Sequence, residues 1–84
     1  MNQSELIFCA FRYCLGRMTY IVSSMCNYLV DHWTDIEPAY QKMILKEIEE
    51  ALELGRAGME QDQDTWLECL KRIDEIELKE CVDD

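Results

Sequence analysis

The sequence predicts an all-α fold, a compact bundle of about four short helices in a single domain over residues 1–84. Apolar residues recur at three- and four-residue steps through most of the chain, which is the spacing of one face of a helix. Only three glycines and one proline interrupt this pattern. No alternation of period two followed by a hairpin turn is present, so strands are not expected.

The first helix is predicted over residues 4–15. Ser4 is expected to cap the free N–H groups of its opening turn, and Gly16 to end it, since glycine adopts the left-handed conformation of a helix end at little steric cost. One apolar stripe follows the helical spacing and comprises Leu6, Ile7, Ala10, Phe11 and Cys14.

The second helix is predicted over about residues 17–33. It is apolar over most of its circumference, which is typical of a central helix. The β-branched residues Ile21, Val22 and Val30 would also suit a strand, but their spacing is helical. The expected buried face consists of Met18, Ile21, Val22, Met25, Leu29 and Trp33, with Cys26 and Val30 at its edges.

The third helix is predicted from Pro38 to about Leu54, with a possible extension to Gly58. A proline disfavours helical geometry at the residue before it and suits the first turn of a new helix. The segment 34–38 therefore separates the second helix from the third. The expected buried row is Tyr40, Met43, Ile44, Ile48, Ala51 and Leu52.

The fourth helix is predicted from Thr65 to about Glu80, with Asp64 as its N-cap. Gly55, Gly58 and the polar stretch 60–64 read as the loop that precedes it. Its apolar residues at helical spacing are Trp66, Cys69, Leu70, Ile73 and Ile76.

The formal net charge is −10, and it is concentrated in the second part of the chain. Residues 1–30 carry a net charge of +1, whereas residues 31–84 carry −11. An acidic surface of this strength repels phosphate backbones and anionic lipids and attracts basic protein surfaces. We therefore expect a protein partner with a basic surface, no direct nucleic-acid binding and no membrane binding.

The five cysteines indicate a reduced protein rather than a disulfide framework. Their number is odd, no secretory signal is recognised before them, and no apolar run approaches the roughly 20 residues that cross a bilayer. The expected compartment is the cytoplasm. A chain this small buries a limited core, which favours association into a homo-oligomer.

Catalysis, metals and cofactors are not expected. His32 is the only histidine, and the cysteines form no C-x-x-C pair. An enzyme could use Cys9 or Cys26 as a nucleophile with His32 as its base. The favoured alternative is a histidine at the end of the second helix that pairs with Asp35.

One unusual cluster lies around Gly16, in the longest stretch without acids, residues 6–30: Arg12, Tyr13, Arg17, Thr19 and Tyr20. A helix that starts directly after Gly16 would present free N–H groups there. Two arginines could then clamp an anion, while a tyrosine offers a stacking face. The favoured alternative is that the arginines pair with glutamates of the third and fourth helices.

Two acidic rows are the second candidate site, a protein-binding surface. Their members are Glu47, Glu50 and Glu53 on the third helix and Asp74, Glu77 and Glu80 on the fourth. Carboxylates at such regular spacing can imitate a nucleic-acid backbone and occupy a basic groove. The favoured alternative is that they form solvated helix faces.

The segment from Phe11 to Ser23, F-R-Y-C-L-G-R-M-T-Y-I-V-S, resembles a group of short phage and prophage proteins. These share an F-R-Y-x-L-G-R-x-T-Y-x-V segment, then a tryptophan, here Trp33, and a glutamate-rich helix, here including residues 46–51. The resemblance implies a phage origin and carries no mechanism.

From this resemblance and the acidic charge we expect a non-enzymatic phage accessory protein that acts in the host cytoplasm. It would inhibit a bacterial defence system, in the manner of an anti-CRISPR protein, by stoichiometric docking of acidic helices on a basic protein surface. The alternative is a sponge that sequesters an anionic nucleotide signal through Arg12, Arg17 and Tyr20. The third possibility is the Cys/His enzyme.

Overall fold

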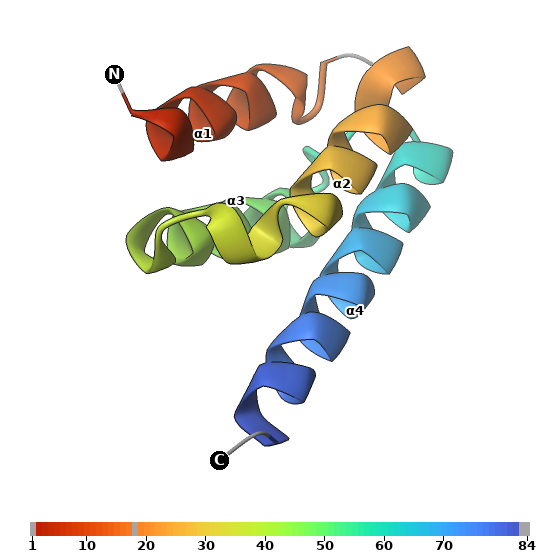
Figure 1. Cartoon of the computed structure of the whole chain (residues 1–84). Coiled ribbons are helices and arrows are strands. Elements are labelled where there is room, and N and C mark those ends of the chain that lie inside the picture. Colours follow the sequence, from red (N-terminus) through yellow and green to blue (C-terminus); the bar gives the residue numbers. More distant parts are fainter. Residues whose placement is uncertain (1, 18, 83–84) are drawn as a thin grey trace.

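A computed structural model describes residues 2–17 and 19–82, and this part of the chain contains helices and no strand (Figure 1). The predicted all-α bundle of four helices is confirmed. The helices are α1 (Gln3–Cys14), α2 (Val22–Asp31), α3 (Pro38–Glu53) and α4 (Glu60–Val82), with 3₁₀ turns η1 (Thr19–Ile21) and η2 (Trp33–Asp35).

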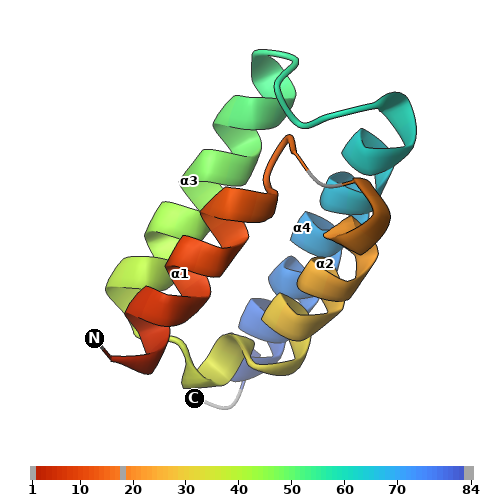
Figure 2. The ribbon, with the colours of Figure 1, turned by 90° about the horizontal axis from the view of Figure 1, so that it is seen from above.

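The helices associate as two pairs, α1 with α3 and α2 with α4, which lie side by side when seen from above (Figure 2). The α2–α4 interface is the most extensive of the bundle. The core fills the space between the pairs, and its largest fully buried side chains are Phe11, Leu29, Trp33, Ile44, Ile48, Trp66, Cys69 and Ile73. Every α-helix therefore contributes to one shared apolar cluster.

The start of α1 differs from the prediction, because Asn2 and not Ser4 is the N-cap. The Asn2 Oδ1 atom accepts a hydrogen bond from the Glu5 N–H at 2.8 Å. Ser4 lies inside the helix and is only 4% exposed. Its hydroxyl accepts a hydrogen bond from the Glu37 N–H at 3.0 Å. The Ser4 oxygen is thus used by a tertiary contact that joins α1 to the start of α3.

Gly16 ends the first helix as predicted, with a positive φ of 77°. Leu15 has φ −61° and ψ 114°, and the Arg17 N–H donates to the Cys14 carbonyl at 3.1 Å, which together form a type II turn. A second constraint was not visible in the sequence. A Cβ atom on Gly16 would collide with the backbone carbonyl oxygen of Arg56, so the two interhelical loops touch at this glycine.

The predicted second helix is divided into three parts. The α-helix begins at Val22 instead of directly after Gly16, because residues 19–21 form the 3₁₀ turn η1. At the other end the Ile36 N–H donates to the Trp33 carbonyl at 3.2 Å, in the tighter 3₁₀ pattern of η2. This turn lies where Trp33 is buried in the core.

The buried face of α2 was predicted only in part. Its members in the structure are Val22, Cys26, Leu29 and, beyond the helix, Trp33. Ile21 and Met25, which were expected on this face, are only half-buried; Met25 still packs against the core, and Met18 is outside the described residues. The wide apolar circumference of the segment therefore serves two surfaces, the core and a second one described below.

The third helix is confirmed from Pro38, and it ends at Glu53 without the extension to Gly58. Gly55 has a φ of 70°, the Arg56 N–H donates to the Ala51 carbonyl at 2.7 Å, and the Gly55 N–H donates to that of Leu52 at 3.4 Å. These two bonds form a Schellman motif. In the predicted buried row, Ile44, Ile48 and Ala51 are buried, Tyr40 and Leu52 are half-buried, and Met43 is exposed.

The fourth helix begins at Glu60, five residues before the predicted start at Thr65, and the predicted N-cap Asp64 lies exposed within it. The buried carboxylate of Asp62 accepts a hydrogen bond from the Met59 N–H at 3.2 Å. An acid at the third helical position that reaches back to the N-cap N–H is half of a capping box. The stretch 60–64 was interpreted as a loop because of its polarity, yet that polarity caps and solvates a helix start.

We predict that Gly16→Ala destabilises the fold more than Gly55→Ala. Both substitutions place a Cβ at positive φ, which costs about 1 to 2 kcal/mol. Only at Gly16 does the new atom also meet backbone, whereas nothing lies within 4 Å at Gly55. The free energy of unfolding, measured by urea denaturation, should fall by at least about 1 kcal/mol more for Gly16→Ala. Equal losses would show that the loops do not touch.

We predict that Ser4→Ala lowers the free energy of unfolding by about 1 to 2 kcal/mol, because the Glu37 N–H loses its acceptor. The exposed Ser23 of α2 provides the matched control, and its replacement by alanine should change stability by less than about 0.5 kcal/mol. Thermal or urea denaturation of both variants measures the difference. Similar stabilities would contradict the link between α1 and α3.

Candidate functional site

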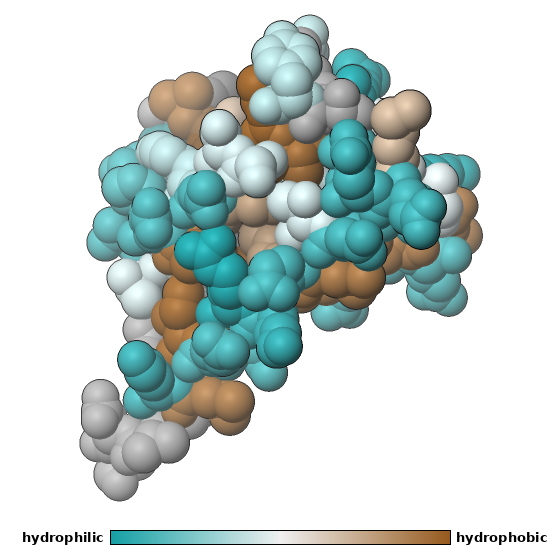
Figure 3. Space-filling model, turned by 90° about the vertical axis from the view of Figure 1, so that its right-hand side faces the viewer, coloured by the Kyte–Doolittle hydropathy of each residue, from teal (hydrophilic) through white to brown (hydrophobic). Residues whose placement is uncertain are grey.

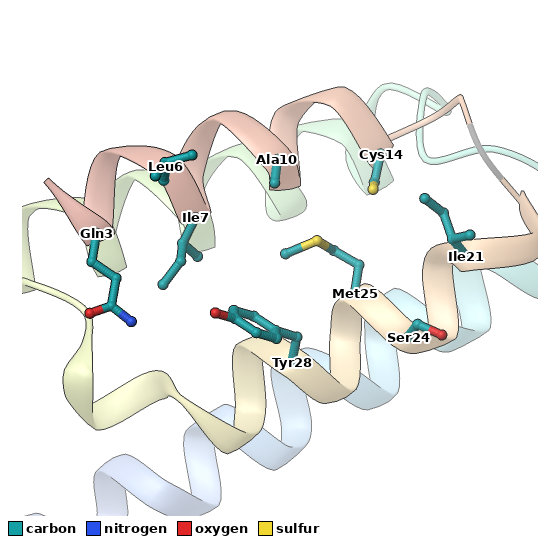
Figure 4. Close-up of a pocket in the computed structure, with 9 residues that line it drawn as sticks. All are labelled: Gln3, Leu6, Ile7, Ala10, Cys14, Ile21, Ser24, Met25 and Tyr28. Atoms are coloured by element: carbon teal, nitrogen blue, oxygen red, sulfur yellow. The ribbon is translucent and has the colours of Figure 1, made fainter. Parts of the chain in front are cut away.

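The faces of α1 and α2 that turn toward one another border an open groove of about 470 Å³. Figure 4 shows Ile7 and Ala10 pointing from α1, and Met25 and Tyr28 from α2, into the space between the helices. This is the second apolar surface of the α2 segment. The complete lining is Gln3, Leu6, Ile7, Ala10, Cys14, Ile21, Ser24, Met25 and Tyr28.

Helical spacing explains why these residues meet. The α1 positions follow steps of three and four residues from Gln3 to Cys14, and the positions from Ile21 to Tyr28 do the same. Ile7 and Cys14 are nearly buried and form the floor. Leu6 on one side is 58% exposed, and Tyr28 on the other is 42% exposed, so the rim offers large apolar side chains to a partner.

The chemistry of the groove favours binding over catalysis. None of its lining residues carries a formal charge at neutral pH. Burial raises the pKa of the Cys14 thiol, which opposes formation of the nucleophilic thiolate. An open apolar surface of this kind gains free energy by covering its side chains with apolar groups of another molecule.

The arginines of the predicted anion site lie beside the acidic row of α3. Arg12 Nε is 4.0 Å from Glu47 Oε1, so the predicted pairing of an arginine with a glutamate of the third helix is confirmed for Arg12. Arg12 also lies over the Phe8 ring, 5.8 Å from its centroid. The Arg12 side chain is 62% exposed and that of Glu47 is 36% exposed, so solvent screens the pair and it adds little stability.

A depression of about 350 Å³ next to this pair is lined by three arginines, Arg12, Arg17 and Arg56. The same depression is lined by Glu47 and Glu50. Positive charge is thus gathered where the prediction placed it, with the unpredicted addition of Arg56. The two carboxylates oppose the binding of an anion there, because they repel it and compete for the guanidinium groups.

The other members of the predicted anion site are dispersed. Tyr13 is exposed and lies under Arg17, whose guanidinium is 5.7 Å from the ring centroid. Tyr20 is 81% exposed in η1. The side chain of Thr19 is outside the described part of the structure. The prediction that an α-helix starts directly after Gly16 and presents free N–H groups to the cluster is wrong, since α2 begins at Val22.

The two acidic rows lie on different helices and do not have uniform surroundings. Glu47 and Glu50 line the arginine depression, whereas Glu53 is exposed. On α4, Asp74 is exposed and Glu77 is half-buried, and the side chain of Glu80 is not described. Figure 3 shows hydrophilic and hydrophobic side chains interleaved on the side of the molecule where α4 lies.

His32 and Cys26 make contacts that hold the fold together. His32 Nδ1 is 3.8 Å from Asp35 Oδ2, which is the predicted pairing at the end of the second helix, and the His32 ring lies 4.4 Å from that of Tyr28. Cys26 is buried against α4, where a hydrogen bond with Cys69 and burial raise the pKa of the Cys26 thiol. This environment opposes nucleophilic use of Cys26.

No family model matches this chain. The comparisons with curated proteins and with solved structures likewise found no similar protein. The resemblance to short phage proteins therefore stays a prediction, and the functional argument has to be made from the geometry of the chain itself. Within the described residues, none of the helices has the length and apolarity that crossing a bilayer requires.

The groove was missed at the sequence level although one signal for it was present. The segment of residues 17–33 is apolar around most of its circumference, and this was assigned entirely to burial. In a bundle of four helices one stripe is enough for the core. The surplus apolar positions, Ile21 and Tyr28, were the indication of a binding surface.

We predict that the cysteines of the native protein react in two classes. In a Cys81→Ser background, iodoacetamide at pH 8 should alkylate the exposed Cys9 at least about tenfold faster than Cys14 or Cys26, because the latter are buried and have raised pKa values. Peptide mass spectrometry identifies the modified sites, and urea should abolish the difference. Rapid alkylation of Cys26 would show that α2 and α4 do not pack together.

Proposed function

We propose that this chain is a non-enzymatic protein that acts by stoichiometric binding of a protein partner, which it holds in the α1–α2 groove. One observation carries the proposal: an open apolar groove with an uncharged lining lies on the surface of a strongly acidic chain. Apolar side chains of a partner gain free energy there, and the charge around the groove selects a partner of opposite sign.

We further propose that the partner is a host defence protein with a basic surface, and that the complex forms in the host cytoplasm and inhibits the defence, as an anti-CRISPR protein does. The resemblance of residues 11–23 to short phage proteins supports this extension. The acidic rows would steer the approach of a basic partner, because exposed carboxylates such as Glu53 and Asp74 act over a Debye length of about 8 Å.

The other functions have less support from the geometry. A nucleotide sponge needs Arg12 and Arg17 to be available to an anion, yet Glu47 pairs with Arg12 and Glu50 lines the same depression. A Cys/His enzyme needs a thiolate beside a base. The near partners of His32 are Asp35 and the Tyr28 ring.

We predict that Ala10→Trp abolishes capture of the partner and Ala39→Trp does not. Both alanines are exposed helical residues, but only Ala10 lies in the groove, where an indole would fill the space that the partner needs. The test is affinity capture from infected bacteria with the wild type, Ala10→Trp and Ala39→Trp, followed by native mass spectrometry of the captured complexes. We expect a one-to-one complex with the wild type and with Ala39→Trp.

Inhibition of a defence system is measured in parallel by plating phage on a defence-carrying host that expresses each variant. The proposal is supported if the phage is no longer protected from the defence by Ala10→Trp but is still protected by Ala39→Trp. A partner that Ala10→Trp retains would contradict binding in the groove. Capture of a nucleotide that is lost in Arg17→Ala would support the sponge instead, and turnover of a substrate by the purified chain would refute a non-enzymatic role.

A further inference from the structure

We infer that the α1–α2 groove takes an amphipathic helix of the partner, with an apolar face in the groove and basic residues over its Gln3–Tyr28 end. The inference rests on the proposed function and names the kind of segment that this site recognises. It is carried by the length of the groove, the nature of its walls and the charges at its two ends.

The length of the groove suits a short helix. Its lining on α1 extends from Gln3 to Cys14, which at about 1.5 Å per residue is roughly 16 Å, or three turns of a helix. A partner helix of this length presents about three anchors at i, i+3 or i+4, and i+7. The groove offers matching space between Leu6, Ala10 and Cys14 on one side and Ile21, Met25 and Tyr28 on the other.

The walls of the groove favour a helix over an extended segment. Both walls are helical, so their main-chain N–H and C=O groups bond within α1 and α2 and offer side chains alone to a partner. An extended segment would leave its own backbone groups unpaired against this apolar lining, which costs free energy. A helix satisfies its backbone internally and brings only side chains.

Small and adaptable side chains lie where a helix would approach most closely. Figure 4 shows the short side chain of Ala10 on α1 directed toward α2, where Ser24 also lines the groove. Both residues are exposed, so no large side chain blocks entry from either position. Met25 lies between them, and its unbranched thioether can adapt to the shape of an incoming side chain.

The two ends of the groove differ in charge. The exposed Asp31 lies one turn beyond Tyr28 on α2, and Asp35 lies beside His32, whose ring contacts that of Tyr28. The Glu37 N–H bonds to Ser4, next to Gln3, and brings a third acid to this end. The opposite end, near Cys14, is followed by Arg17. Lysines or arginines of a bound helix are therefore favoured at the Gln3–Tyr28 end.

A second copy of this chain is a poorer occupant. Each copy carries a net charge of −10, so association of two copies brings like charges together, whereas a basic helix is attracted. A small apolar molecule would fill the groove without using the acids at its end. The effect on binding of reversing the acids at that end therefore distinguishes a basic helix from a second copy and from a small apolar molecule.

The test uses two labelled peptides of about 18 residues with leucines at the same helical spacing, one with lysines and one with glutamates on the polar face. Fluorescence anisotropy should detect binding of the lysine peptide alone. A lysine peptide of the same composition with its leucines scrambled should bind at least about tenfold more weakly, since it presents no apolar face.

Two pairs of variants locate the contact. Ala10→Trp should weaken binding of the lysine peptide at least about tenfold and Ala39→Trp should leave it unchanged. The double reversal Asp31→Lys with Asp35→Lys should weaken it at least about tenfold more than Glu49→Lys with Glu53→Lys. The two double variants change the net charge by the same amount, and all four acids are exposed.

Several outcomes would overturn the inference. Equal binding of the lysine peptide by Ala10→Trp would place it outside the groove. Equal effects of the two double reversals would show that net charge alone acts. Absence of peptide binding together with a dimer that Ala10→Trp dissociates in sedimentation would assign the groove to a second copy. If the partner of the proposed function is lost in Ala10→Trp while neither peptide binds, this inference fails and the proposed function stands.

Discussion

The position of α1 depends on the contact of Phe11 with Trp66. Phe11 is fully buried, and its ring meets that of Trp66 edge to face, with 5.6 Å between the centroids. This geometry is a favourable one for two aromatic rings. Phe11 joins α1 to the core, and the Ser4 hydroxyl joins α1 to the start of α3. Because these two contacts hold α1 in place, α1 does not need to pack tightly on α2. The facing surfaces of the two helices are left open as the groove.

The aromatic core has a polar cost. In the described part of the chain, the indole N–H groups of Trp33 and Trp66 are buried and have no hydrogen-bond partner. An unpaired buried donor costs about 1 to 3 kcal/mol. Burying an indole removes about 150–250 Å² from water, which at about 25 cal/mol per Å² gives roughly 4 to 6 kcal/mol, so each tryptophan still stabilises the fold.

Local signals in the sequence were enough for the helices and their main breaks. The positive φ of Gly16 depends on the conformational freedom of glycine, and the start of α3 at Pro38 depends on the fixed φ of proline; both effects act within a few residues. The true roles of Ser4 and Asp62 could not be read in the same way. The hydroxyl of Ser4 bonds to a residue 33 positions away, and the polar stretch around Asp62 has the composition of a loop.

The candidate sites were predictable to different extents. The pairing of Arg12 with Glu47 follows from the excess of carboxylates in the sequence, since an arginine rarely lacks such a partner there. The groove was not predictable, because its existence depends on how far α1 stands from α2. The contacts of Phe11 and Ser4 on the other side of α1 set that separation. The spacing of apolar residues within α1 does not predict it.

The touching loops have a consequence for how such a chain can diverge. At position 16 the side chain must be absent, while at position 56 the contact uses only a main-chain oxygen, which every amino acid supplies. A substitution at one position therefore cannot be compensated by a substitution at the other. Covariation between homologous sequences would not reveal this contact, and a glycine at position 16 would be its only trace in an alignment.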